Sequence, residues 1–320
     1  MLRRRVGTSG LAVSRLGLGT LTWGNGADIE SATAQLATFV DAGGSLVETC
    51  DGYTGGESQR MLGDAMAKLC VSGMRREQLV LAGRTDVPPG GLARGALLAA
   101  LDATLTRLGT DHLDLWQLPF PGAGEPAGLD EALTALQVAV LSGRVRYAGL
   151  VGPRGWQLAT AVERARGMGQ ATVPVSAQVE YSLLVRAPEG ELLAAAAHHG
   201  IGLLAWAPLG RGVLTGKYAD GTPTDSRGAS GALARYVEAR RTRPAVRIVQ
   251  AVLTAADGLG TSPLAVALAW ARDRPGVAAT VVGARDRAQL AAALATEPLV
   301  LPDEIRAALD DVSRPHPAPS

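Results

Sequence analysis

The chain has 320 residues but only two cysteines and two lysines. Cys50 and Cys70 make neither a disulfide scaffold nor a cysteine-rich metal site. Lys68 and Lys217 are the only lysines, so arginine carries nearly all of the positive charge. The formal net charge is +1, which gives no signal for a nucleic acid or an anionic membrane surface. We therefore expect neither as a partner.

Long apolar runs are also absent. No stretch reaches the roughly 20 apolar residues that a helix needs to cross a bilayer. The basic start at residues 3–5 is followed by Gly7-Thr8-Ser9-Gly10 instead of the apolar core of a signal peptide. We expect a cytoplasmic protein.

Short apolar runs alternate with amphipathic helical patterns along almost the whole chain. Residues 3–15 predict a small hairpin with its turn at residues 7–10. The predicted strands are residues 16–19, 45–48, 79–83, 113–118, 146–151, 173–179, 202–207 and 278–282. The predicted helices are residues 28–42, 57–69, 91–108, 129–142, 155–168, 189–199, 243–272 and 286–296. This alternation indicates parallel βαβ units, and eight strands close a barrel. We predict one α/β domain over residues 1–320, a (β/α)8 TIM barrel with an N-terminal β-hairpin.

Several local signals mark the ends of these elements. Asp28, Asp130 and Asp286 each precede an apolar periodic run and are expected N-caps. Ser262 is an expected N-cap followed by Pro263 at the first helical position, and this pair is expected to break the helix over 243–272. The segment 210–242 is long and irregular, and it is either a functional lid or a surface insertion. Residues 313–320 are expected to form a disordered tail.

One strand end concentrates reactive side chains. The predicted strand 45–48 runs into Glu48, Asp51 and Tyr53, and a helical pattern follows directly. In an α/β barrel the chemistry sits at the C-terminal ends of the strands. These three residues are therefore candidates for acid–base chemistry.

Five motifs in the same order along the chain carry a resemblance to a known family. They are residues 10–20 (GLAVSRLGLGT), 108–118 (LGTDHLDLWQL), 178–184 (QVEYSLL) with Arg186 and Glu189, 207–218 (APLGRGVLTGKY), and 282–285 (VGAR) with Gln289. Each motif alone is weak, but together they resemble the aldo-keto reductases over essentially the whole chain.

The resemblance implies an NADP-dependent (β/α)8 barrel that reduces aldehydes and ketones with an Asp-Tyr-Lys-His tetrad. Tyr53 falls on the tyrosine, whereas Glu48, Arg84 and Pro119 fall on the aspartate, lysine and histidine. A free tyrosine has a pKa near ~10, which a neighbouring cation lowers. Glu48 and Arg84 are either a matched pair that tunes Tyr53 electrostatically, with the guanidinium binding the carboxylate through two hydrogen bonds, or products of drift. Pro119 has no side-chain donor, so the contribution of the histidine is lost.

The resemblance also implies an NADP site. Val151 and Gly152 replace the pair that holds the nicotinamide carboxamide, so two hydrogen-bonding side chains are missing. Trp206 is either the aromatic platform for the nicotinamide or a core residue. Gln289 is either a phosphate contact or a helix-capping residue. The implied cofactor-binding residues are Gly19, Thr20, Gln178, Trp206, Leu209, Arg211, Gly212, Lys217, Gly283, Arg285 and Gln289. We expect NADP to bind more weakly than in the family, and Arg285 favours NADP over NAD.

Aromatic residues near the strand ends are the substrate candidates. They are Trp23, Trp116 and Phe120, alongside Trp206, and some of them are alternatively core residues. Together they favour a small-molecule substrate that is bulky and hydrophobic or aromatic.

Three functions follow from these observations. The first is an NADP(H)-dependent oxidoreductase with a rebuilt active site, such as secondary metabolism would use, which acts on a carbonyl or conjugated group with Tyr53 as the proton donor. The second is a non-redox barrel enzyme, a dehydratase, isomerase or cyclase, that uses Tyr53, Glu48 and Asp51. The third is a non-catalytic NADP-binding regulatory protein, like the aldo-keto-reductase-like subunits of channels.

Overall fold

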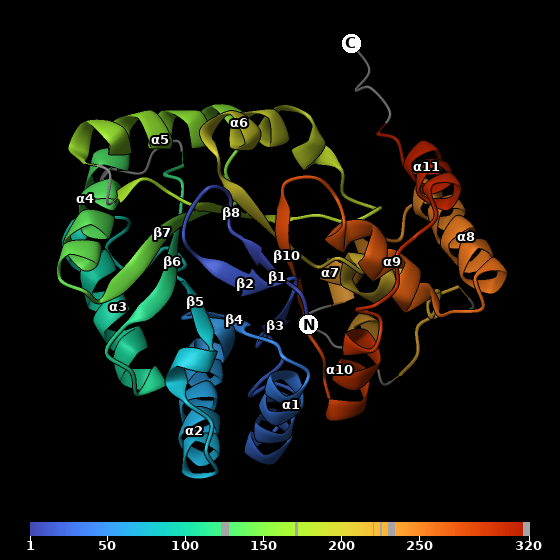
Figure 1. The fold of residues 1–320 in the computed structure, drawn as a ribbon, viewed down its shortest axis with the longest axis horizontal. Coiled ribbons are helices and arrows are strands. Elements are labelled where there is room, and N and C mark those ends of the chain that lie inside the picture. Colours follow the sequence, from blue (N-terminus) through green and yellow to red (C-terminus); the bar gives the residue numbers. More distant parts are fainter. Residues whose placement is uncertain (123–127, 170–171, 220, 225, 230–233, 316–320) are drawn as a thin grey trace.

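The computed structural model describes residues 1–122, 128–169, 172–219, 221–224, 226–229 and 234–315. Eight parallel strands form a closed barrel in which each strand pairs with its neighbours in chain order, and the last pairs with the first (Figure 1). The strands are β3 (Leu16–Gly19), β4 (Leu46–Cys50), β5 (Val80–Arg84), β6 (Leu113–Pro119), β7 (Val145–Val151), β8 (Ser176–Glu180), β9 (Gly202–Trp206) and β10 (Val277–Val282). The predicted barrel is confirmed.

Helices surround the barrel because each buries one apolar stripe against the outer face of the strands. They are α1 (Ile29–Asp41), α2 (Glu57–Val71), α3 (Arg94–Leu108), α4 (Gly128–Leu141), α5 (Gly155–Met168), α6 (Glu191–His199), α8 (Arg243–Gly258), α9 (Pro263–Arg272) and α10 (Arg287–Leu294). Asp28, Ser262 and Asp286 cap α1, α9 and α10 by accepting a backbone N–H, as predicted. Asp130 does not: α4 already begins at Gly128, so Asp130 lies in its first turn.

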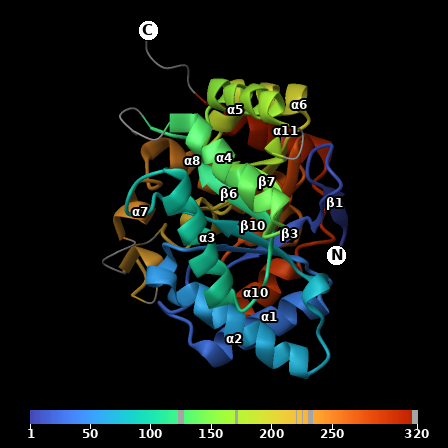
Figure 2. The ribbon, with the colours of Figure 1, turned by 90° about the vertical axis from the view of Figure 1, so that its left-hand side faces the viewer.

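The N-terminal hairpin closes one end of the barrel. Its strands β1 (Arg3–Arg5) and β2 (Ala12–Ser14) pair antiparallel, as predicted. Val6, Leu11 and Val13 belong to the apolar cluster that fills the barrel interior. Figure 2 shows β1 and α7 (Ala234–Glu238) at opposite ends of the molecule. The opposite end, where the strands finish, is therefore left for the functional site.

The segment 210–242 is not a plain loop. It contains two 3-10 turns, η5 (Gly210–Thr215) and η6 (Arg227–Ala229), and the short helix α7. Residues 220, 225 and 230–233 of this segment lie outside the described residues.

A further helix, α11 (Asp303–Val312), was not predicted from the sequence. Asp310 on α11 accepts hydrogen bonds from Trp270 at 2.9 Å and from Arg274 at 2.7 Å. Ser313, in the predicted tail, is buried and accepts a hydrogen bond from Arg186 at 2.9 Å. Residues 316–320 of that tail lie outside the described residues.

Within the described ranges, no single helix is long and apolar enough to cross a membrane. The pair α8 and α9 meets the length and composition criteria together, but the chain bends by 105° between them.

Candidate functional site

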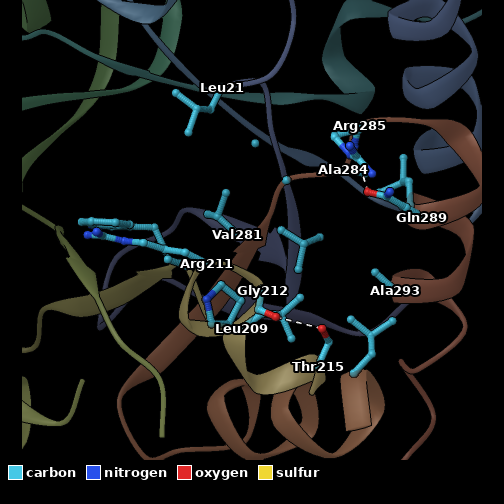
Figure 3. A pocket seen from close by; sticks show the side chains of 18 of the residues that line it. Leu21, Leu209, Arg211, Gly212, Thr215, Val281, Ala284, Arg285, Gln289 and Ala293 are labelled. Atoms are coloured by element: carbon cyan, nitrogen blue, oxygen red, sulfur yellow. Dashed lines mark hydrogen bonds between the residues drawn. The ribbon is translucent and has the colours of Figure 1, made fainter. Parts of the chain in front are cut away.

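A cavity of about 680 Å³ opens at the C-terminal ends of the strands (Figure 3). Residues at or just beyond the ends of β3, β4, β5, β9 and β10 line it. Tyr53, Glu48 and Arg84 line it together with Lys217 and Arg285. The residues predicted for catalysis and for phosphate binding therefore share one cavity.

Tyr53 reaches the cavity from a sharp turn just after β4. It begins the 3-10 helix η1 (Tyr53–Gly56), in which Thr54 has a φ of 50° and Gly56 a φ of 90°. A non-glycine residue with positive φ costs on the order of 1 kcal/mol. The Thr54 hydroxyl offsets this cost by donating a hydrogen bond to the carbonyl of Trp23 at 2.8 Å. The turn thus returns the Tyr53 ring over the end of its own strand.

The Tyr53 hydroxyl donates a hydrogen bond to Glu48, at 3.1 Å from Oε1 and 3.4 Å from Oε2. Glu48 is buried in the middle of β4, where it pairs with Gly19 of β3. At Gly19 a Cβ would come within 2.9 Å of Val281 and 3.5 Å of Glu48 Oε2, so the absence of a side chain there makes room for the carboxylate.

A chain of buried side chains fixes the direction of these hydrogen bonds inside the barrel. The Ser176 hydroxyl donates to Gln117 Oε1 at 3.1 Å, and the Gln117 amide donates to Gln178 Oε1. The Gln178 amide then donates to Glu48 Oε1 at 3.1 Å. Glu48 consequently receives donors from Gln178 and Tyr53, an arrangement that suits a carboxylate acceptor.

The predicted two-pronged pairing of Arg84 with Glu48 is wrong. In the part of the chain that the structure describes, the carboxylate oxygen within 4.0 Å of Arg84 belongs to Asp86, at 3.8 Å. The Arg84 guanidinium instead lies over the Tyr53 ring, 5.3 Å from its centroid. The side chain leaves β5 next to β4, and the longer Glu48 side chain is already held by Tyr53 and Gln178.

Burial raises the pKa of Tyr53 well above its ordinary value, and the Glu48 carboxylate raises it further. The positive charge of Arg84 acts in the opposite direction, as predicted, but is outweighed. The pKa of Arg84 is itself raised: burial would lower it, but the nearby Tyr53 and Glu48 stabilise its charged form. Tyr53 is therefore a neutral phenol beside a fixed cation at neutral pH.

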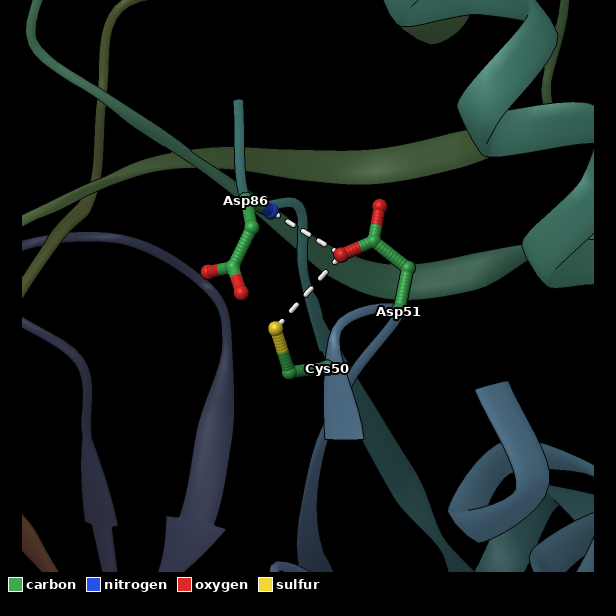
Figure 4. Close-up of side chains that lie close together, drawn as sticks. All are labelled: Cys50, Asp51 and Asp86. Atoms are coloured by element: carbon green, nitrogen blue, oxygen red, sulfur yellow. Dashed lines mark hydrogen bonds between the residues drawn. The ribbon is translucent and has the colours of Figure 1, made fainter. Parts of the chain in front are cut away.

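Asp51 turns away from Tyr53. Its Oδ1 accepts the backbone N–H of Asp86 at 2.9 Å and lies 3.5 Å from the Cys50 sulfur (Figure 4). The metal-binding atoms of Cys50, Asp51 and Asp86 lie within 4.8 Å of one another. Burial raises the pKa of the Cys50 thiol far above its ordinary value, and the Arg84 guanidinium lies beside Asp86. A protonated thiol and a neighbouring cation make this a poor place for a metal ion.

Another part of the cavity wall combines a glycine-rich turn with two cationic side chains. Gly210 and Gly212 have φ values of +54° and +94°, so this loop folds in a way that favours glycine. A Cβ at Gly212 would come within 3.1 Å of the Lys217 side chain. Arg285 lies half-buried in the cavity wall just before α10 (Figure 3). The backbone N–H groups of Gly210 and Gly212 donate within the turn, to Ala207 and Leu209, so the features here that suit an anion are the cationic side chains of Lys217 and Arg285.

Gln289 acts as a helix-capping residue. Its backbone N–H donates to Asp286 Oδ1 at 2.8 Å, and its side-chain oxygen accepts the backbone N–H of Arg285 at 3.2 Å. In a capping box the Gln289 side chain would accept the backbone N–H of Asp286, whereas here it accepts that of the preceding residue, Arg285. The helix-capping interpretation of Gln289 therefore holds with one partner shifted by one residue. Gln289 also lines the cavity.

Arg211 lines the cavity but its charge is paired within the protein. Its guanidinium binds Glu180 at 2.8 Å and donates to the backbone carbonyl of Tyr236 at 2.7 Å. Arg240 binds the same carboxylate with two nitrogens, at 2.9 and 2.7 Å. Glu180 at the end of β8 thus joins η5 and α7 to the barrel.

Trp206 is a wall of the cavity and not a core residue. Its ring is stacked with that of Tyr236, with the centroids 6.4 Å apart and 13° between the planes. Tyr236 lines the same cavity and was missed by the sequence analysis. The segment 210–242 holds two tyrosines, Tyr218 and Tyr236, and the sequence carries no signal that singles out Tyr236.

Several predicted contacts do not line the cavity. Thr20 is buried and its hydroxyl accepts a hydrogen bond from Ser58 at 2.8 Å. Trp23 and Trp116 are fully buried core residues whose indole N–H groups donate to Gln35 and Thr85. The substrate role predicted for both is therefore wrong.

Phe120 also lies outside the cavity wall. Its ring meets that of the exposed Trp156 edge to face, with the centroids 5.6 Å apart and 74° between the planes.

The cavity fits the phosphates and adenosine of NADP better than its nicotinamide. Arg285, Lys217 and the glycine loop provide charge and close backbone approach, and the small side chains of Ala292 and Ala293 complete that end. Gln178, predicted to contact the nicotinamide carboxamide, is not among the residues that line the cavity, and its amide is engaged on both sides, by Gln117 and Glu48. The chain's own residues can therefore hold the dinucleotide chiefly through its phosphates.

A family model described as "Aldo/keto reductase family" matches residues 15–314. The chain is 31% identical over 316 residues to a probable voltage-gated potassium channel subunit beta of Oryza sativa subsp. japonica, over 95% of this chain and 94% of that protein. It is 32% identical over 324 residues to the uncharacterized oxidoreductase YrpG of Bacillus subtilis (strain 168), over 96% and 94% of the two chains. It is 29% identical over 354 residues to Protein tas of Escherichia coli (strain K12), over 100% of both. The chain belongs to the aldo/keto reductase family.

Proposed function

We propose that this protein is an NADP(H)-dependent oxidoreductase with a rebuilt proton-transfer site. The observation that carries the proposal is the shared cavity: Tyr53 and Glu48 line it together with Arg285 and Lys217. A dinucleotide needs cations for its phosphates, and its reactive ring must meet the substrate beside an acid–base pair. This cavity offers both kinds of residue. When bound, NADPH supplies a hydride to the substrate carbon.

Tyr53 and Glu48 move the proton. In alcohol oxidation, Tyr53 takes the proton of the substrate hydroxyl while passing its own proton to Glu48 along the existing hydrogen bond. In carbonyl reduction the transfer runs in reverse, from protonated Glu48 through Tyr53 to the substrate oxygen. Gln178 holds Glu48 in place during both directions, and Arg84 stabilises negative charge on the Tyr53 oxygen.

The substrate that we propose is a bulky organic molecule with a carbonyl or conjugated group. Apolar side chains line much of the cavity wall, among them Leu21, Leu209 and Val281 (Figure 3). Trp206 and Tyr236 add aromatic surface. A wall of this kind favours a hydrophobic or aromatic ligand over a small, highly charged one.

Two alternatives each have one observation in their favour. The name of the rice relative, a probable channel subunit, supports a regulatory protein that binds NADP without turnover. The direct bond between Tyr53 and Glu48 supports a non-redox acid–base enzyme. NADPH consumption separates the proposed oxidoreductase from both.

The test is NADPH oxidation with a panel of aromatic aldehydes, ketones and quinones, for the wild type and Tyr53→Phe. The wild type should turn over at least one compound, and the substitution should lower the rate by roughly 10²- to 10⁴-fold because a general acid is lost. Tyr147→Phe, which removes a phenol outside the cavity, is the matched control. Turnover that survives in Tyr53→Phe would refute the assignment of the acid.

A further inference from the structure

The reaction proposed above needs a donor that binds the substrate oxygen. Arg84 at the end of β5 and Trp206 at the end of β9 line the cavity and carry N–H donors, but neither offers a hydroxyl. Pro119 has no side-chain donor at the end of β6. The Tyr53 hydroxyl is engaged with Glu48 at 3.1 Å. The Gln178 amide donates to Glu48 and is likewise committed. A second hydroxyl donor to the substrate oxygen, besides Tyr53, would therefore come from another part of the cavity wall.

Tyr236 is the one other tyrosine among the residues that line this cavity. It belongs to α7 in the segment after β9, far from Tyr53 in sequence. Within the described ranges, no hydrogen bond involves its hydroxyl, whereas its backbone carbonyl accepts one from Arg211. Burial raises the pKa of this phenol, while the charges of Arg211 and Arg84 lower it in part. Tyr236 is thus a neutral donor close enough to Arg84 to sense its charge.

The ring of Tyr236 is held from two sides. It stacks with Trp206, whose ring plane differs from its own by 13°, and the Arg211 guanidinium lies over its face. Arg211 and Arg240, which flank α7 in space, both bind Glu180 at the end of β8. Glu180 is therefore the anchor that ties α7 to the barrel. These contacts fix a side chain that an irregular segment would otherwise leave mobile.

We propose that Tyr236 is a substrate-binding residue, whose hydroxyl donates a hydrogen bond to the carbonyl oxygen that Tyr53 protonates. This inference rests on the proposed oxidoreductase function. It assigns to the segment after β9 the oxygen-binding role that Pro119 cannot perform. Ligands with a carbonyl oxygen on a planar aromatic frame suit the site, because Trp206 adds an aromatic surface to the cavity wall beside the Tyr236 hydroxyl.

The test measures binding of phenanthrenequinone by calorimetry, with and without NADP. Tyr236→Phe keeps the ring and its stacking but removes the donor, so quinone affinity should fall about tenfold. NADPH affinity should stay within about twofold of the wild type, because no phosphate contact changes. Tyr147→Phe, outside the cavity, should bind the quinone as the wild type does.

The outcomes separate this proposal from the function on which it rests. Equal quinone affinity in Tyr236→Phe and the wild type would overturn the role of Tyr236, and so would a wild type that does not bind the quinone. If the wild type binds the quinone but does not bind NADPH, only the proposed oxidoreductase function would be overturned. Where turnover is measurable, Tyr236→Phe should also raise KM for the quinone without changing the pH profile set by Tyr53.

Discussion

The Tyr53 hydroxyl donates directly to Glu48 across 3.1 Å, and no ion pair within 4.0 Å joins that carboxylate to Arg84 in the described part of the chain. The acid is thus coupled to a buried carboxylate through a hydrogen bond, and to the cation only through space, at 5.3 Å from its ring. This separation assigns the two partners different tasks. In the proposed function, Glu48 exchanges the proton and Arg84 sets the electrostatic potential around it.

Glu48→Gln tests the proton exchange. The amide oxygen can still accept the Tyr53 hydrogen bond, but the side chain cannot take the proton. Turnover should therefore fall roughly 10²- to 10⁴-fold. The pKa of Tyr53 should also fall, because the carboxylate charge that disfavours the phenolate is gone.

Ultraviolet titration of the phenolate measures the pKa of Tyr53 in Glu48→Gln. The titration curve of the double variant Glu48→Gln/Tyr53→Phe is subtracted, so that the remaining signal comes from Tyr53. An unchanged Tyr53 pKa together with wild-type turnover would show that Glu48 is a structural acceptor only.

Arg285→Ala tests the phosphate end of the cavity. Losing a charged hydrogen-bond partner should weaken NADPH binding by about tenfold or more. NADH binding should weaken less, because the 2′-phosphate is the group that an arginine recognises. Arg287→Ala is the matched control: Arg287 lies two residues further along and donates to Thr38 at 3.0 Å, outside the cavity. Equal effects of the two substitutions would argue against a phosphate contact at Arg285.

Glu180→Gln tests the anchor of α7. The substitution leaves Arg211 and Arg240 without their shared carboxylate, so α7 should detach from the barrel more often. Hydrogen exchange over residues 234–240 should be faster than in the wild type. Glu238→Gln, which removes an exposed pair with Arg241, should change the exchange little. Wild-type exchange in Glu180→Gln would mean that α7 is held by stacking alone.

The raised pKa of Tyr53 predicts a loss of stability in alkali. The unfolded chain releases the phenol proton near pH ~10, whereas the folded protein retains it to higher pH. This contribution is fully present below pH ~10 and is lost as the pH rises toward the folded pKa. Tyr53→Phe should be less stable than the wild type at neutral pH, because its hydrogen bond is gone. Urea unfolding should show this gap shrinking above pH ~10, and a constant gap would contradict the shift.

The strand order and the position of Tyr53 could be predicted because apolar runs and turn signals are local. The side of the strand on which Trp116 lies could not be predicted, because β6 is buried on both faces and its sequence pattern shows no polar face. Side chains alternate along a strand, so once Gln117 points into the barrel, Trp116 must pack outward against the helices. The core positions of Trp23 and Trp116 thus follow from tertiary packing.

Other parts of the site depend on reach and on irregular backbone. Whether Glu48 meets Arg84 or Tyr53 is decided by a few ångströms of side-chain length, which sequence position does not encode. Tyr236 sits on the short helix α7 inside a long segment without a periodic pattern, so nothing in the sequence aligned it with the cavity. Asp286 and Gln289, by contrast, follow a capping pattern and were recognised as a possible cap.

The most direct test of the account is a titration with NADPH followed by protein fluorescence. Trp206 lines the cavity, whereas Trp23, Trp116 and Trp270 are buried core residues, so Trp206 should report occupancy. The account predicts saturable quenching at submillimolar NADPH, most of which disappears in Trp206→Phe while calorimetry still detects binding. The absence of both quenching and heat at submillimolar NADPH in the wild type would contradict the proposed function.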